Sequence, residues 1–237
     1  MNILKTGLRA CAVFCVLSAG CSQRQGKPET IQAQQGAAAN LDAARKIVAQ
    51  TAQTYHAMDN PTLLKRLAEQ SAKKKEPFNS LAFRELQGRK DVSSESLASM
   101  IKEKGDADAL LPLLLLRRLD ANAYRDVSVD LKVAILTDAL RTSRTFNTWG
   151  LPNFYVEEAS NALIECGRSA YPALKQMLSD TRPAPVFGSK MHMEYLRHRY
   201  RLCDYALFLI ERIQGKSDFR MPPAVAERDS LIKEILK

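Results

Sequence analysis

The chain has 237 residues and a formal net charge of +9, and 46% of its residues are hydrophobic. This length allows one domain with a substantial core or a short array of repeats. Ten glycines, ten prolines and an aromatic content of 7% are low for an all-β protein, which needs many turns, and therefore exclude that class.

Residues 1–20 have the layout of an export signal. Lys5 and Arg9 precede an uncharged, mostly apolar run from Ala10 to Ala19. This run is too short for a membrane-spanning helix, which needs roughly twenty apolar residues. We therefore expect a signal peptide that is removed. Its loss takes away two cations and no acid, which leaves a basic mature chain with a net charge of +7.

The segment 17–21, Leu-Ser-Ala-Gly-Cys, resembles the lipobox of bacterial lipoproteins. The resemblance implies cleavage between Gly20 and Cys21 and attachment of acyl chains to Cys21. Each buried methylene contributes about 0.8 kcal/mol, so several chains form a lasting membrane anchor. Ser22 stands where an Asp retains enteric members of the family in the inner membrane, which indicates the outer membrane, facing the periplasm. An ordinary secretory signal is the alternative.

The segment that follows is expected to be a tether. Residues 22–40 are rich in Gln, Ala and Gly and contain almost nothing apolar to bury. Such a composition favours a flexible segment. The expected organisation is a signal peptide at 1–20, the lipidated cysteine and flexible tether at 21–40, and an α-helical domain at 41–237.

From Leu41 onward the apolar residues recur with helical spacing almost everywhere. The run Leu202, Tyr205, Ala206, Leu209, Ile210 and Ile213 follows the i, i+3, i+4, i+7 pattern over three turns. No segment of similar length alternates as a strand does. Short connections between amphipathic helices predict antiparallel helical hairpins. We expect an all-α fold.

Two stretches look like copies of one hairpin. Residues 96–120 and 158–180 each give a helix, a glycine, a few small or polar residues and then a proline eight positions before an aspartate. The pattern resembles HEAT-like helical repeats, and residues 199–236 would supply another helix pair. This resemblance, from about residue 95, implies an irregular HEAT-like array of stacked hairpins. A compact helical bundle is the alternative.

A looser resemblance concerns the carboxy-terminal half. Its Trp-Gly-Leu-Pro segment at 149–152 and its Arg-Leu-Cys-Asp-Tyr-Ala-Leu segment at 201–207 are similar to those of uncharacterised bacterial proteins. No activity follows from that resemblance.

Two cysteines are left to pair in the mature chain. Cys11 and Cys15 leave with the signal peptide and Cys21 takes the lipid, so Cys166 and Cys203 are the candidates for a disulfide, which an oxidising periplasm permits. Both lie on the apolar side of an expected helix. A free cysteine in that position behaves as a small buried hydrophobe, which is the alternative.

Familiar catalytic motifs are missing from the sequence. It contains no Gly-x-Ser-x-Gly, no phosphate-binding Gly-rich loop, no His-Glu-x-x-His and no Cys-x-x-Cys. Only His56, His192 and His198 could serve as imidazole bases or ligands. We predict no catalytic residues, no metal site and no cofactor.

Three features are candidates for binding. Arg197, Arg199 and Arg201 form a basic cluster that could pair with phosphate groups of anionic envelope lipid or glycan. The only tryptophan, Trp149, lies in a loop and could anchor a partner or fill a gap between hairpins. Lys73, Lys74 and Lys75 form a second basic run, and for either run a solvated charged face is the alternative. Export argues against nucleic acid as a partner.

The sequence therefore gives three hypotheses for function. The leading one is a lipid-anchored, non-enzymatic protein-interaction or scaffold module that binds another envelope protein through the surface of its helical array. The second is a binder of anionic envelope lipid or glycan through the arginine cluster. The third is an enzyme with an unfamiliar site, which a pocket lined by ionisable groups with shifted pKa values would favour.

Overall fold

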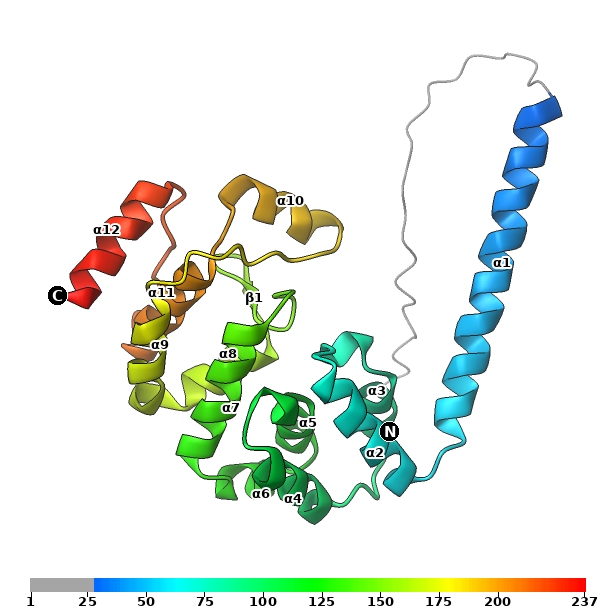
Figure 1. Ribbon diagram of the computed structural model, residues 1–237, viewed down its shortest axis with the longest axis horizontal. Helices are drawn as coiled ribbons and strands as arrows, with labels where there is room; N and C mark the ends of the chain where they lie inside the picture. Colours follow the sequence, from blue (N-terminus) through cyan, green and yellow to red (C-terminus); the bar gives the residue numbers. More distant parts are fainter. Residues whose placement is uncertain (1–27) are drawn as a thin grey trace, which may run out of the picture. The chain divides into compact units, whose positions relative to one another are not determined.

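The computed structural model describes the backbone of residues 28–237 and the side chains of 40–188 and 191–237 (Figure 1). The described part of the chain divides into two units between Ala49 and Gln50. The helices run in chain order as α1 Pro28–His56, α2 Asn60–Ala72, α3 Leu81–Leu86, α4 Ser94–Lys104, α5 Leu110–Leu119, α6 Ala121–Asp126, α7 Val129–Thr142, α8 Glu158–Glu165, α9 Tyr171–Met177, α10 Ser189–His198, α11 Leu202–Ile213 and α12 Val225–Leu236.

The expected all-α fold of helical hairpins is confirmed. Short 3₁₀ turns lie at η1 Pro77–Asn79, η2 Ala107–Ala109 and η3 Gly167–Ala170, and the described residues contain a single sheet of two short strands.

The first helix corrects the expectation of a flexible tether up to Asn40. α1 begins at Pro28, so the described part of that segment, 28–40, is helical. The sequence argument considered only the lack of apolar residues to bury. Alanine and glutamine are nevertheless strong helix formers, so a segment rich in them forms a helix without a core of its own.

Local capping signals fix where the hairpin helices begin and end. The Asp59 side chain accepts a hydrogen bond from the Thr62 amide at 2.9 Å and so caps the start of α2. Ser93 caps α4 in the same way at 3.0 Å. Gly105 ends α4 with a φ of 66°, a conformation in which glycine is favoured.

The two stretches with similar sequence adopt the same order of elements. Each has a helix, a glycine with positive φ, a 3₁₀ turn and a second helix that contains proline: α4, Gly105, η2 and α5 in one, and α8, Gly167, η3 and α9 in the other. α4 packs directly on α5, whereas α8 and α9 both pack on α11 (Figure 1). The expected third pair, α11 and α12, is also in contact.

Two helices supply much of the core. In α5 the six residues from Leu111 to Leu116 are all buried. In α11 every residue from Leu202 to Glu211 is buried, because α8, α9 and α12 surround it. Burial on all sides explains why polar residues within α11 need partners from other elements.

The loop between α7 and α8 is held against α11 by hydrogen bonds. It contains a short hairpin in which the two-residue strands β1 Gly150–Leu151 and β2 Tyr155–Val156 pair antiparallel. The Tyr205 hydroxyl of α11 donates to the Gly150 carbonyl at 2.7 Å, and the Tyr200 hydroxyl donates to the Pro152 carbonyl at 3.0 Å. The Trp-Gly-Leu-Pro segment therefore serves to connect helices.

The hairpin requires glycine at position 150. Gly150 has a φ of 85°, and a Cβ there would lie 2.5 Å from the Tyr155 carbonyl oxygen. Gly215 has nearly the same φ, 86°, but a Cβ there would meet nothing within 4 Å. An alanine at either position would carry the cost of the left-handed backbone conformation, but only an alanine at 150 would also clash with the Tyr155 carbonyl.

We expect Gly150→Ala to destabilise the fold far more than Gly215→Ala. The left-handed conformation costs about 1–2 kcal/mol with a side chain, which applies to both variants. The clash at position 150 should add about 1–3 kcal/mol. Urea unfolding of both purified variants measures the difference, and equal losses of free energy of unfolding would contradict the close approach of Gly150 to Tyr155.

Candidate interaction surface

The residues of the expected lipid anchor, Gly20 and Cys21, lie outside the described residues. Within residues 28–237, no helix is both long enough and apolar enough to cross a bilayer.

Trp149 is a buried residue, 2% exposed, which corrects the idea that it anchors a partner from an exposed loop. Its indole N–H donates to the Ser143 hydroxyl at 2.9 Å, and its carbonyl accepts from the Ser160 hydroxyl at 2.6 Å. The physical reason is that Ser143 at the end of α7 holds the indole N–H, while Ser160 of α8 holds the backbone of the same residue. Trp149 thus fills the space between helices.

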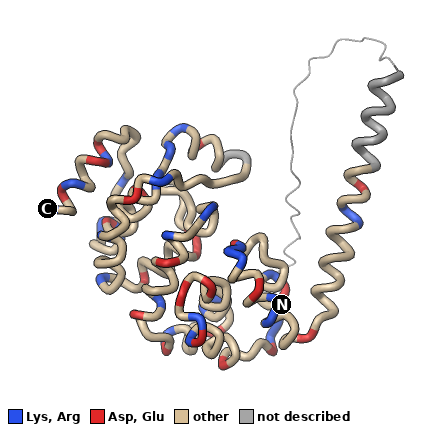
Figure 2. Tube along the Cα trace, in the orientation of Figure 1, with Lys and Arg blue, Asp and Glu red and all other residues tan. Residues whose placement is uncertain are grey.

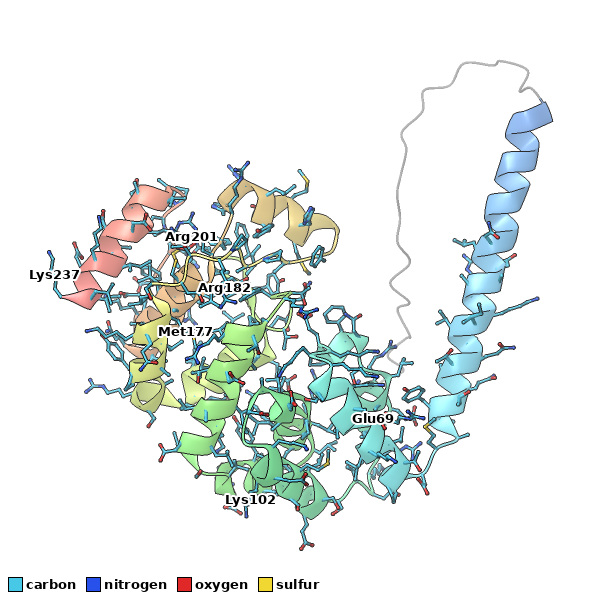
Figure 3. The ribbon with its side chains drawn as sticks, in the orientation of Figure 1. Glu69, Lys102, Met177, Arg182, Arg201 and Lys237 are labelled. Carbon is cyan, nitrogen blue, oxygen red and sulfur yellow. The ribbon has the colours of Figure 1, made fainter. Side chains whose placement is uncertain are left out.

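The three arginines of the expected basic cluster have different environments in the structure. Arg197 and Arg199 are exposed, but the Arg201 side chain is only 15% exposed and forms ion pairs with Asp204 at 2.9 Å and Asp229 at 2.7 Å. Figure 3 labels Arg201, which lies just before α11. These hydrogen bonds raise the pKa of the Arg201 guanidinium above its usual value. Arg201 is therefore not free to bind phosphate, and the cluster of three is reduced to two.

Asp204 is the centre of this network. Its carboxylate is fully buried and accepts from Arg201 and, at 2.9 Å, from Arg228 of α12, whose side chain is also fully buried. It also accepts from the Arg201 amide at 2.8 Å, which caps the N-terminus of α11. Arg228 donates further to the His198 carbonyl at 2.9 Å, so the network joins the end of α10 to α11 and α12.

Cys166 and Cys203 do not form the disulfide that was considered. Both thiols are free and buried. Burial raises the pKa of Cys166 to about 11 and that of Cys203 to about 12. Protonated, enclosed thiols are poor nucleophiles, so both cysteines act as packing residues.

An exposed apolar surface surrounds α10, and we call it the α10 surface. Met193 and Leu196 are 66% and 49% exposed and are neighbours on the helix because they are three residues apart. Met191 on another side of the helix, and Phe154 and Phe187 in the neighbouring loops, are exposed as well, and we include them in the surface. Met193 and Leu196 present neighbouring apolar groups to solvent on one face of α10, and an exposed apolar face of this kind marks a site of protein or membrane contact.

Loop contacts hold the α10 surface in place. The Asn147 side chain donates to the Phe187 carbonyl at 2.6 Å and accepts from the Phe187 amide at 3.0 Å. His192 stacks on the Phe187 ring, with centroids 6.1 Å apart, and its Nδ1 lies 3.2 Å from the Val186 carbonyl. The Tyr155 hydroxyl contacts the Met191 sulfur at 3.2 Å.

Positive charge borders the α10 surface at one end. Arg197 and Arg199 are exposed, and Figure 2 shows Lys and Arg positions along the connection from α10 to α11. Arg199 ends α10 in the left-handed conformation, with a φ of 49°. Next to it, His198 packs between Phe154 and Tyr200, and burial lowers the pKa of His198 below its usual value.

The sequence analysis did not find this surface. The segment 191–196 is too short for its apolar and polar residues to show a clear helical pattern. The exposed positions of Phe154 and Phe187 depend on contacts between the two loops, which no local pattern reveals.

No known protein helps to interpret the surface, because comparison with family models, curated proteins and solved structures gives no match. Among the side chains that the structure describes, no three His, Cys, Asp or Glu residues gather as a metal site would require.

We expect Asp204→Asn to destabilise the protein strongly. The substitution leaves Arg201 and Arg228 without their buried counter-charge, and breaking a buried pair costs about 3–5 kcal/mol. The matched control is Asp229→Asn, because Asp229 also pairs with Arg201 but its side chain is 43% exposed. This control should cost less than about 1 kcal/mol. Urea unfolding checks both values, and a loss at position 204 no larger than at 229 would contradict the assigned role.

Proposed function

We propose that this chain is a lipid-anchored protein of the bacterial cell envelope that acts as a non-enzymatic protein-interaction module. Its lipobox-like segment supports the anchor, and the anchor would hold the helical domain on the periplasmic side of the outer membrane. The single observation that carries the interaction role is the exposed α10 surface.

The composition of the α10 surface matches that of protein interfaces. Their centres are enriched in aromatic residues and methionine, and arginine is enriched as well. Phe187 and Met193 are 53% and 66% exposed, which is costly unless another apolar surface covers them. Methionine adapts to an irregular partner surface because its side chain is unbranched and polarisable.

The positive charge of Arg197 and Arg199 beside the α10 surface indicates which chemistry a partner should have. Arg197 and Arg199 are exposed and have no carboxylate ion pair among the described residues. A partner with an apolar centre and acidic residues beside it would cover the apolar groups and pair with both arginines. The partner class is therefore an envelope protein with an acidic border around an apolar patch.

The binding of anionic lipid or glycan by three arginines receives less support. Arg201 is committed to Asp204 and Asp229, so the cluster offers two free cations. The apolar groups beside those cations are better suited to a protein partner than to a glycan, which presents hydroxyl groups.

We expect the double variant Met193→Glu/Leu196→Glu to abolish partner binding and leave the fold intact. Both residues are exposed, so the new charges remain solvated in the free protein. In a complex they would be buried and would face acidic residues. The measurement is photo-crosslinking in intact cells from a probe placed at position 191, followed by purification and identification of the crosslinked partner.

The matched control is Val225→Glu, since Val225 is an exposed apolar residue on α12, outside the α10 surface, with 44% exposure. The control should retain the same crosslinked partner. If the double variant keeps it too, the α10 surface is not the interface. If the surface crosslinks to no protein and the unlipidated chain instead floats with anionic vesicles, a membrane occupies the surface and the proposal of a protein partner is wrong.

We expect Cys21→Ser to block lipidation and processing, so that the chain keeps its signal sequence or is released from the membrane. The serine hydroxyl cannot replace the thiol that receives the lipid. Mass spectrometry of the amino terminus and membrane fractionation provide the measurements. The matched control is Ser22→Ala, which retains the cysteine. An unchanged mature mass and unchanged membrane association of the Cys21→Ser chain would refute the anchor.

A further inference from the structure

The α10 surface contains two of the chain's seven methionines, and both expose their side chains. Met193 is 66% exposed and Met191 is 40% exposed. Four other methionines lie in the described part of the chain and are less exposed: Met58, Met100, Met177 and Met221. Of these, Met177, which Figure 3 labels on α9, is only 2% exposed. The thioethers that a dissolved reagent reaches are therefore concentrated on α10 within the described residues.

The two thiols of the folded domain do not compete with these thioethers. Cys166 and Cys203 are buried, and burial raises the pKa of Cys166 to about 11 and that of Cys203 to about 12. Oxidants react with the thiolate, which is scarce near neutral pH when the pKa is this high. A thioether has no proton to lose, so its sulfur keeps its nucleophilic lone pairs at every pH. Exposure then decides which sulfur reacts first.

The two sulfur atoms of α10 have different environments. Residues two apart on a helix lie on nearly opposite sides, so Met193 shares a face with Leu196 and Met191 does not. The Tyr155 hydroxyl donates to the Met191 sulfur at 3.2 Å. Burial raises the pKa of Tyr155 to about 12, so the phenol keeps the proton that it donates. Met193 should react faster, because it is more exposed and the Met191 sulfur shares a lone pair with Tyr155.

A peroxide converts a thioether to a sulfoxide in one two-electron step. A lone pair of the sulfur attacks one oxygen of hydrogen peroxide, so that an S–O bond forms and the O–O bond breaks. The sulfur loses two electrons, and the leaving hydroxide takes the proton of the transferred oxygen and departs as water. A reductase that oxidises a dithiol to a disulfide returns the sulfoxide to the thioether and releases the oxygen as water.

Oxidation changes the two positions in different ways. A thioether is a weak hydrogen-bond acceptor, whereas a sulfoxide is polar and its oxygen accepts strongly. At Met191 the Tyr155 hydroxyl is already in place to donate to that oxygen. At Met193, next to Leu196, an apolar partner would bury the oxygen without a donor. Burial of an unpaired polar group at this position should weaken the complex at least about tenfold.

We propose that Met193 and Met191 are sites of reversible oxidation by peroxide, and that the sulfoxide at Met193 releases the protein partner from the α10 surface. This inference rests on the proposed function, since it requires a partner at that surface. The α10 surface binds its partner while the thioether at Met193 is reduced, and a sulfoxide reductase restores binding after oxidation.

The order of oxidation tests the first half of the proposal. The full mature protein is exposed briefly to hydrogen peroxide, and peptide mass spectrometry follows the gain of one oxygen at each sulfur. Met193 should react first and Met191 second, and Met193 should react at least about tenfold faster than the buried Met177 and Met221. Oxidation of Met177 as fast as that of Met193 would refute the selectivity.

The Tyr155→Phe variant tests the different environments of the two sulfurs. Phenylalanine lacks the hydroxyl that donates to the Met191 sulfur, so oxidation of Met191 should become faster while the rate at Met193 stays the same. Equal rates at Met191 in the variant and in the unsubstituted protein would show that Tyr155 does not protect that sulfur.

Crosslinking in isolated cell envelopes tests the release of the partner. A photoreactive probe at position 154 reports the partner, and each variant is judged by the ratio of its crosslink yields after and before peroxide. The yield of the unsubstituted protein should fall about tenfold, as its affinity does, and recover after treatment with methionine sulfoxide reductase and dithiothreitol. Met193→Leu should keep a ratio near one, because leucine is apolar and has no sulfur. Met58→Leu is the matched control, since Met58 lies outside α10, and should remain as sensitive as the unsubstituted protein.

The outcomes separate this inference from the proposed function. A crosslink that persists when Met193 is fully oxidised overturns the inference and leaves the proposed interface intact. Loss of the crosslink from the Met193→Leu chain at the same peroxide dose also overturns it, because the oxidation that releases the partner then lies elsewhere. If no protein is crosslinked before peroxide is added, the proposed function fails and the release of a partner fails with it.

Discussion

The carboxylate of Asp204 is the charge on which the arrangement of the last three helices depends. It lies on α11, a helix surrounded by α8, α9 and α12, and a buried carboxylate is stable only with counter-charges and hydrogen bonds. Arg201 supplies one from the start of the helix, and Arg228 supplies the other from α12. Because Arg228 also donates to the His198 carbonyl, the same arginine fixes the end of α10. This contact fixes the last turn of α10 through its backbone, so it requires no burial of the helix's apolar side chains.

Much of the fold follows from local sequence signals. The apolar period of 202–213 predicts α11, and the glycines at 105 and 167 predict the ends of the first helices in the two similar hairpins. These signals act within one or two turns and do not depend on the rest of the chain. The helix that begins at Pro28 was not predicted. The segment has few apolar residues to bury, but its alanine and glutamine content favours a helix by itself.

The candidate sites depended on contacts that no local pattern contains. In sequence, Arg201 belongs to a basic cluster, but in the structure it pairs with Asp204 and with Asp229 of α12. Trp149 lies in a loop, but Ser143 binds its indole and Ser160 binds its carbonyl. Glu76 follows three lysines, a context that suggests a solvated face, yet its partner Thr145 lies 69 residues away. Sequence reasoning therefore identified the residue types that matter and misjudged which of them are accessible.

The segment before α8 fixes the position of one side of the α10 surface. Asn147 binds both backbone polar groups of Phe187, and the Thr148 carbonyl accepts from the Ala159 amide at 3.2 Å, which ties the same segment to α8. Because α8 packs on α11, the exposed ring of Phe187 is positioned through the buried core and not by α10 alone. A substitution that loosens the contact between this segment and α8 should therefore disturb the α10 surface without touching any of its exposed side chains.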